Sequence, residues 1–169
     1  MLIKKEIFKK IGGFDEDYFA YFEDVDLCWR AWLYGYKVIY VPTSIVYHKL
    51  GGSWGGYHSY FRVYYSVRNR FFNIIKNFEI KRLLIGLIIS LIFDIFKMLV
   101  FIYRLQGVNI LAILKANIDA LKKLRIMVRK RMIVQSNRCL KDKDLIDMNF
   151  LMSITESIKE YIRLHRLLC

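Results

Sequence analysis

The sequence is poor in the residues that mark secreted, fibrous and linker-rich proteins. Its 169 residues include one proline, nine glycines and three cysteines, which excludes collagen-like and linker-dominated chains. The cysteines (Cys28, Cys139 and Cys169) lie far apart and form no Cys-x-x-Cys pair, so we expect no disulfide framework or zinc knuckle and a reducing compartment. The first ten residues hold four lysines without a following apolar segment, so a signal peptide is not expected.

Acidic residues are scarce in the middle of the chain. Residues 61–140 contain 16 Lys/Arg and three Asp/Glu, whereas the segments on either side are balanced, so the net charge of +13 lies entirely in this segment. The segment is also the most apolar part of the chain. Basic residues beside a long apolar stretch are typical of proteins at an anionic membrane surface. Nucleic-acid binding is not expected, because no recognition motif accompanies the basic residues.

Residues 83–103 form an apolar stretch long enough to cross a bilayer as a helix. Asp94 and Lys97 interrupt it, and each costs about 2.5–3.5 kcal/mol at the centre of a spanning helix. With Gly86 and Ser90 they recur every three or four residues as one polar stripe. Because basic residues flank both ends, we expect a helix in the plane of the membrane surface, or packed on its neighbours, rather than a crossing. A buried core helix is the alternative.

Residues 1–60 have the pattern of half an α/β unit. Apolar periodicity predicts a short helix over 4–11 and a second helix over 23–34, which Gly35 ends. β-branched and aromatic residues predict short strands over 37–41 and 45–47. The expected fold class is therefore an α/β fragment with a few short strands, followed by long apolar and amphipathic helices that make the chain mostly helical overall.

Three parts are expected along the chain. Residues 1–60 carry the candidate chemistry, residues 61–132 form basic-flanked, membrane-associated helices, and residues 133–169 form an amphipathic helical tail.

Six acidic residues make the densest group of ionisable side chains, and they are Asp15, Glu16, Asp17, Glu23, Asp24 and Asp26. Adjacent carboxylates at a loop-to-helix junction suit a general base, because repulsion and partial burial can raise a pKa toward neutrality. The alternative is that acids in a first helical turn simply stabilise the helix dipole. His48 follows the second predicted strand and could bind a divalent metal or a phosphate group.

Five motifs follow one another in the first part of the chain, at residues 11–16, 21–30, 35–38, 40–42 and 47–53. Their order and spacing resemble the C-terminal half of family 2 glycosyltransferases, and most closely the rhamnosyltransferase-like branch with a GT-A fold. The likeness covers residues 4–75, including the aromatic stretch 65–73.

The resemblance implies a role for each motif residue. Asp24 is expected to be the general base on the acceptor hydroxyl, with Glu23 beside it, and His48 to complete the coordination of a Mg²⁺ or Mn²⁺ ion on the donor diphosphate. The acceptor side is expected to be formed by Gly12, Gly13, Phe14 and Asp15. Asp26 and Arg30 are expected to support the helix that carries the motif.

The resemblance also implies partners. The expected activity is hexosyl transfer from a nucleotide-sugar donor to a glycan or lipid-linked acceptor in cell-surface polysaccharide biosynthesis. The nucleotide-binding half with its Asp-x-Asp motif is not present upstream of Gly12. We therefore expect a truncated or split enzyme that needs a separate N-terminal half chain, cytoplasmic and peripheral on the inner face of the cell membrane. The alternative is a non-catalytic membrane-surface protein derived from such an enzyme.

Overall fold

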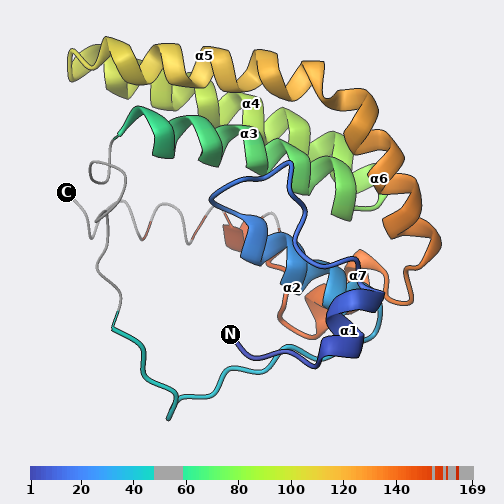
Figure 1. The fold of residues 1–169 in the computed structure, drawn as a ribbon. Helices are drawn as coiled ribbons and strands as arrows, with labels where there is room; N and C mark the ends of the chain where they lie inside the picture. Colours follow the sequence, from blue (N-terminus) through green and yellow to red (C-terminus); the bar gives the residue numbers. More distant parts are fainter. Residues whose placement is uncertain (48–58, 154, 158, 160–162, 164–169) are drawn as a thin grey trace.

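The structure is a computed structural model that describes residues 1–47, 59–153, 155–157, 159 and 163 (Figure 1). Its helices, in chain order, are α1 (Lys5–Lys10), α2 (Glu23–Leu33), α3 (Tyr60–Asn77), α4 (Ile80–Tyr103), α5 (Gly107–Lys122), α6 (Leu124–Ser136) and α7 (Asp142–Asp147). Within these ranges the chain contains no strand.

Helix α3 is the centre of the fold. It contacts α4 and α5, which lie beside it at the top of Figure 1, and it contacts α2, which lies below it. Helix α6 descends from the end of α5 and packs on the C-terminal half of α3. Two layers therefore meet at α3: the loop and helix with the acidic motif on one side, and the apolar helices on the other.

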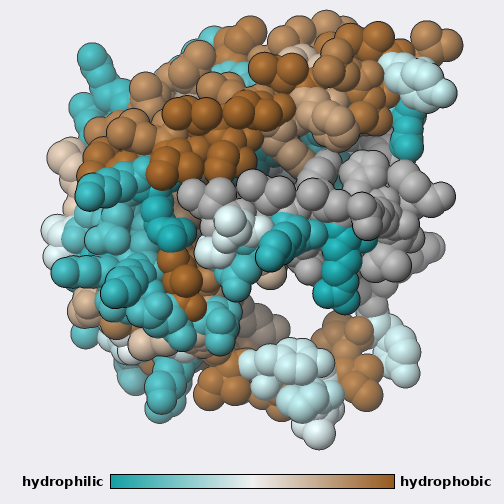
Figure 2. All heavy atoms as spheres, turned by 180° about the vertical axis from the view of Figure 1, so that it is seen from behind, coloured by the Kyte–Doolittle hydropathy of each residue, from teal (hydrophilic) through white to brown (hydrophobic). Residues whose placement is uncertain are grey.

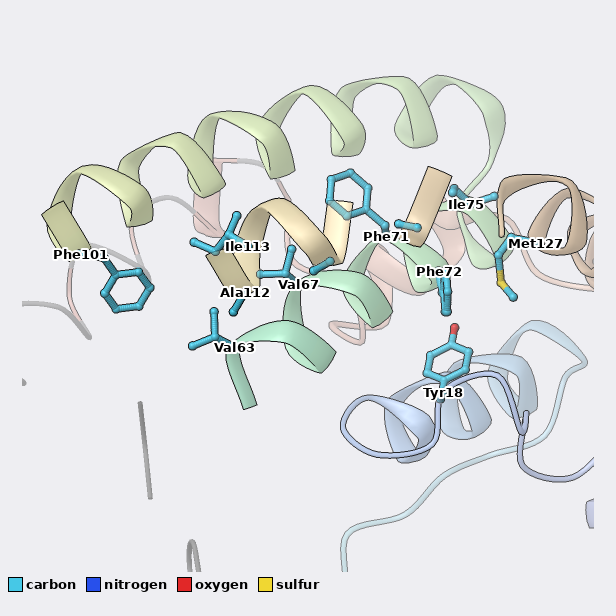
Figure 3. Close-up of a cluster of buried hydrophobic side chains, with 12 residues drawn as sticks. Tyr18, Val63, Val67, Phe71, Phe72, Ile75, Phe101, Ala112, Ile113 and Met127 are labelled. Carbon is cyan, nitrogen blue, oxygen red and sulfur yellow. The ribbon is translucent and has the colours of Figure 1, made fainter. Parts of the chain in front are cut away.

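The main hydrophobic core joins α3 to α5 (Figure 3). Val63, Val67 and Phe71 recur every four residues and place one face of α3 inward, where they are buried. Ala112, Ile113, Ala116 and Ala120 of α5 complete this interface. The small alanine side chains let the two helix backbones approach closely, and Tyr18 extends the core toward the acidic loop by packing on Phe72.

The predicted helices of the N-terminal part are confirmed. The predicted helix over 4–11 is α1, and the predicted helix over 23–34 is α2. Gly35 ends α2 in the left-handed conformation with φ of 82°, and the N–H of Tyr36 returns to the carbonyl of Ala31. This is the C-terminal capping geometry that glycine adopts without strain.

The predicted strands, and with them the α/β fold class, are wrong. Residues 37–41 and 45–47 run as an exposed segment, with Ile39, Tyr40 and Tyr47 between 75% and 97% exposed. The one backbone hydrogen bond that the structure gives within this segment closes a turn, from the Ser44 N–H to the Val41 carbonyl. A β-branched sequence favours extended backbone, but a strand needs a neighbouring strand to satisfy its peptide groups. The expectation that the chain is mostly helical is confirmed.

Helix α4 is long and apolar enough to cross a membrane by length and composition, and its buried residues are Leu83, Ser90, Asp94 and Phe101. Because most of its side chains are not buried, α4 is not the buried core helix of the alternative expectation. Its polar stripe faces α3, where Arg70 Nε donates to Ser90 Oγ at 2.6 Å and Arg70 Nη2 lies 2.5 Å from Asp94 Oδ1. Asp94 also accepts a hydrogen bond from Asn117 of α5. These polar contacts fasten α4 to the bundle.

Candidate active site

Three acidic side chains in the first turn of α2 occupy different environments. Asp24 is exposed, and its Oδ1 accepts the N–H of Val25 at 2.8 Å. Glu23 is half-buried, and its Oε2 has no hydrogen-bond partner among the described residues. Asp26 is fully buried. The same helix dipole acts on all three, so tertiary packing rather than the dipole decides which carboxylate is open to a ligand.

Asp26 lies at the centre of a buried polar network that holds α2 against α3. Arg30 Nη2 lies 2.7 Å from Asp26 Oδ2, and Lys76 Nζ lies 2.9 Å from Asp26 Oδ1. Tyr18 and Asn77 donate hydrogen bonds to the same carboxylate. Burial, and then the negative charge of Asp26, raise the pKa of the Tyr18 phenol well above its usual value. The carboxylate of Asp26 therefore has a structural role, because its oxygens are taken up by contacts that hold α2 against α3.

Arg30 also fixes the glycine turn that follows α1. Its guanidinium donates to the carbonyl of Ile11 and, at 2.7 Å, to the carbonyl of Gly13. Gly12 and Gly13 have φ of 85° and 63°, and a Cβ on Gly13 would lie 3.2 Å from the ring of Phe8. Both left-handed conformations and the close ring favour glycine here. The Asp26–Arg30 pair therefore links α2 to this turn.

Asp15 and Asp17 are held by lysines from distant helices. Asp15 lies 2.6 Å from Lys76 Nζ of α3 and also pairs with Lys130 of α6. Asp17 lies 2.6 Å from Lys123 Nζ and 2.6 Å from Lys130 Nζ. Burial by itself raises the pKa of the Asp15 carboxyl, but the two lysine ammoniums outweigh burial and lower that pKa from 3.8 to about 2.

We expect this carboxylate to make the fold sensitive to acid. Because the folded pKa of about 2 lies below the ordinary value of 3.8, Asp15 stabilises the fold above about pH 4, and this contribution, on the order of 2 kcal/mol, is lost as the pH falls toward 2. Urea unfolding across this range measures it. In Asp15→Asn the loss between pH 4 and 2 should shrink, whereas the exposed neighbour variant Glu16→Gln should keep it. An unchanged acid profile in Asp15→Asn would contradict the assignment.

A cleft of about 660 Å³ lies beside this cluster. It is lined by three of the four residues expected on the acceptor side, Gly12, Phe14 and Asp15, together with Arg30, Lys76 and Lys130. Gly13 is not among its lining residues. Asp24 does not line this cleft either, so the structure places the predicted base and these three predicted acceptor residues at separate hollows.

Asp24 lines a second cavity, of about 380 Å³, whose walls are mainly aromatic and apolar. The other lining residues are Val25, Cys28, Trp29, Trp32, Leu145, Phe150 and Leu151. The Trp32 and Phe150 rings are packed with their centroids 3.7 Å apart. The indole N–H of Trp29 is buried and has no hydrogen-bond partner among the described residues. An exposed carboxylate at the edge of an aromatic hollow can accept a proton from a hydroxyl while the rings pack on an apolar face.

The loop before Asp24 is held in an unusual conformation. Phe19, Tyr21 and Phe22 have φ of 62°, 64° and 68°, which non-glycine residues seldom adopt. Asn69 Nδ2 donates to the carbonyls of Tyr18, Ala20 and Tyr21 at 2.7 to 2.9 Å, and Arg68 donates to those of Asp17 and Tyr18. Strained backbone that the surrounding structure fixes in this way often occurs at functional sites.

Sequence reasoning assigned no role to these residues of α3. The available signal was Asn69, Asn73 and Asn77, which recur every four residues on a helix otherwise rich in aromatics. All three are buried, at 0% to 3% exposure, and face the acidic loop and α2. A buried polar stripe on a helix indicates a partner that satisfies its hydrogen bonds.

His48 is the metal ligand that the resemblance implies. His48 lies outside the described residues. Among the described residues no group of three His, Cys, Asp or Glu side chains is placed to hold a metal ion. Asp15, Asp17 and Asp26, which could supply oxygen ligands, are already paired with lysine or arginine. These three carboxylates are therefore not available as ligands to a divalent cation.

Comparison with known proteins identifies the family to which this chain belongs. The model of glycosyl transferase family group 2 matches residues 1–118, and the chain belongs to this family. The resemblance inferred from the motifs is therefore confirmed. No solved structure matches the chain significantly.

Curated relatives are rhamnosyltransferases. N-acetylglucosaminyl-diphospho-decaprenol L-rhamnosyltransferase of Mycobacterium tuberculosis is 44% identical over 55 residues, which cover 32% of this chain and 18% of that protein. Rhamnosyltransferase WbbL of Escherichia coli is 44% identical over 48 residues, covering 28% and 18%. The dTDP-rhamnosyl transferase RfbF of Shigella flexneri is 34% identical over 83 residues, covering 45% and 28%. The chain thus spans between about a fifth and somewhat over a quarter of the length of these relatives.

Proposed function

We propose that this chain supplies the acceptor-side half of a glycosyltransferase that moves a sugar from a nucleotide-sugar donor to a glycan or lipid-linked acceptor. The observation that carries the proposal is the contrast between the two aspartates of the α2 motif. Asp26 is buried in ion pairs, whereas Asp24 is exposed at the edge of an aromatic cavity. The relatives include a dTDP-rhamnosyl transferase and an N-acetylglucosaminyl-diphospho-decaprenol L-rhamnosyltransferase, and their names support this donor and acceptor class.

Asp24 is the general base in this proposal. As the acceptor hydroxyl oxygen forms its bond to the anomeric carbon of the donor sugar, the Asp24 carboxylate takes the hydroxyl proton. The bond from that carbon to the diphosphate breaks, and the nucleotide diphosphate leaves with the bonding electron pair. Asp24 is suited to this because its carboxylate is exposed and forms no ion pair with any residue that the structure describes.

The aromatic cavity beside Asp24 is proposed to receive the acceptor. The Phe150 ring, which is 47% exposed and packs on Trp32, offers an apolar surface to the less polar face of a sugar ring. Trp29 lines the same cavity, and its buried indole N–H, which has no partner among the described residues, is available to a sugar oxygen that enters there. In this proposal the ion pairs of Asp15 with Lys76 and Lys130 position the loop, and the cleft beside them does not bind the reacting hydroxyl.

The donor and its metal need groups outside the described residues. We propose that a separate N-terminal half chain supplies the nucleotide-sugar site, and that His48 helps to hold a Mg²⁺ or Mn²⁺ ion there in the complex.

Reconstitution tests the proposed function. The full chain is mixed or co-expressed with a donor-binding half from a related rhamnosyltransferase, and transfer of labelled rhamnose from dTDP-rhamnose to a polyprenyl-diphosphate-linked N-acetylglucosamine is measured. We expect transfer with both chains and none with either alone. A stable complex without transfer would favour the alternative, a non-catalytic protein derived from such an enzyme.

A further inference from the structure

Helix α4 exposes its apolar face and buries its polar face, the opposite of a helix on a water-facing protein surface. From Leu84 to Tyr103, all the exposed side chains are hydrophobic. The polar residues of the same stretch point the other way: Ser90 and Asp94 are 3% and 1% exposed, and the Lys97 ammonium lies 4.8 Å from the ring centre of Phe93. A water-facing helix would show the opposite arrangement.

The apolar surface continues from α4 onto α5. The exposed apolar residues are Leu84, Ile85, Ile88, Ile89, Leu91, Ile92, Ile95, Phe96, Leu99, Ile102 and Tyr103 of α4, with Val108, Leu111, Leu114, Ile118 and Leu121 of α5. We call these residues the apolar face. Figure 2 shows hydrophobic side chains gathered across the upper part of one side of the molecule, the level at which α4 and α5 lie in Figure 1. A soluble monomer rarely exposes so large a continuous patch.

Basic side chains border the apolar face at both ends of α4 and along α5. Lys81 and Arg82 stand at the start of α4 and Arg104 directly after its end, while Lys115 lies among the apolar residues of α5. In the described part of the chain, α4 and α5 carry two acidic residues, and both are paired: Asp94 with Arg70, and Asp119 with Lys122. The border is therefore complementary to anionic lipid headgroups.

We propose that the apolar face docks on the surface of an anionic lipid bilayer, with α4 lying in the membrane plane. The side chains of α4 and α5 enter the boundary between headgroups and acyl chains, and the basic border contacts the headgroups. An anionic membrane supplies an apolar interior for the apolar face and negative headgroups for the basic border. A protein partner would need both kinds of surface, and the described residues of α4 and α5 offer a second copy no unpaired acidic side chain for the border.

The contacts of α4 argue against a crossing. The Arg70–Asp94 pair ties α4 to α3, which also carries the buried Lys76 that pairs with Asp15 and Asp26. A crossing α4 would draw α3 and its charges into the hydrocarbon or break these pairs, and either outcome is costly. Basic residues at both ends of α4 also favour in-plane docking, because a single span concentrates its basic residues on one side.

Vesicle binding by the purified full chain tests the docking. We expect cosedimentation with mixed phosphatidylglycerol–phosphatidylcholine vesicles, and at least tenfold weaker binding to pure phosphatidylcholine. Raising the salt from about 0.1 M to about 1 M shortens the screening length roughly threefold and should weaken binding to the anionic vesicles. Equal binding to both vesicle types, or no binding to either, would overturn the proposal.

A pair of matched variants locates the docking surface. The double variant Ile88→Glu/Ile92→Glu places two negative charges in the apolar face and should weaken vesicle binding at least tenfold. Each substitution removes an apolar side chain whose transfer from water into the membrane favours binding. The control Ile45→Glu/Val46→Glu adds the same charges at side chains that are 74% and 79% exposed on another segment, and should bind like the unaltered chain. Far-UV circular dichroism confirms that both variants are folded. Equal effects of the two variants would contradict docking through α4.

Depth measurements distinguish a helix in the membrane plane from a crossing. Leu84→Cys, Ile92→Cys and Ile102→Cys are labelled with an environment-sensitive fluorophore in a chain whose three native cysteines are replaced by serine. In-plane docking gives similar quenching depths at all three positions, and alkaline carbonate releases the protein. A deep centre with shallow ends, or resistance to extraction, would show a crossing. Dimerisation that is abolished by Ile88→Glu/Ile92→Glu without any vesicle binding would assign the face to a second copy.

Discussion

Asp24→Asn is expected to lower the rate of sugar transfer by the reconstituted enzyme by about 10²- to 10⁴-fold, the range typical of a lost general base. Asparagine keeps the shape of the side chain and can still accept the Val25 N–H, but its amide does not take up a proton at neutral pH. The effect should fall on kcat, with little change in KM for the nucleotide sugar. Initial rates at saturating acceptor, with labelled donor, measure the loss.

Two companion variants make the Asp24 experiment decisive. Glu6→Gln removes an exposed carboxylate from the first turn of another helix, α1, and should leave transfer unchanged. Asp24→Glu should retain measurable transfer, because it restores a carboxylate at a slightly different distance. Full activity of Asp24→Asn would show that Asp24 is not the general base. A loss of transfer rate in Glu6→Gln equal to that in Asp24→Asn would indicate a general effect of charge at a helix terminus.

Asp26→Asn is expected to destabilise the fold by about 3–5 kcal/mol, the usual result of removing one partner from a buried ion pair. The variant leaves the Arg30 guanidinium and the Lys76 ammonium beside a neutral amide in a site with no exposure. Because Arg30 also holds the carbonyl of Gly13, the glycine turn should loosen together with α2. Urea unfolding monitored by circular dichroism gives the change in free energy.

Asp24→Asn is the matched control for this stability experiment. It makes the same chemical change two residues away at an exposed position, so its effect on the free energy of unfolding should stay within about 0.5 kcal/mol. The two variants therefore separate the roles of two neighbouring aspartates, one catalytic in our proposal and one structural. Similar destabilisation by both would show that Asp24 also supports the fold.

Local signals in the sequence were sufficient to predict the helices of the N-terminal part and to identify the family. Gly35 predicted the end of α2 because a left-handed residue is needed there, and the family match confirmed the resemblance drawn from the motifs. The strands failed for a physical reason. Extended backbone at 37–41 and 45–47 is a local preference, but a sheet requires a second strand, and the described residues contain none.

The candidate site depended more strongly on contacts between distant segments. Sequence spacing brought six acids together, yet it could not show that Lys76 and Lys130, more than 60 residues away from Asp15, occupy its carboxylate. Nor could it show that Asn69 fixes the carbonyls of the loop before α2. Such partners are set by the packing of α3 and α6 against the loop, for which a single sequence carries little signal.

Sequence alone determined that this chain has a family 2 glycosyltransferase motif and a long apolar helix with a narrow polar stripe, because both are patterns of residue type and spacing. Tertiary structure decided which aspartate is buried and which is exposed, since that depends on where Arg30, Tyr18 and Lys76 are placed around the first turn of α2. It also decided that the polar stripe of α4 turns inward to Arg70 and leaves the apolar side exposed. A helix has the same periodicity whichever way it faces, and only its neighbours fix its orientation.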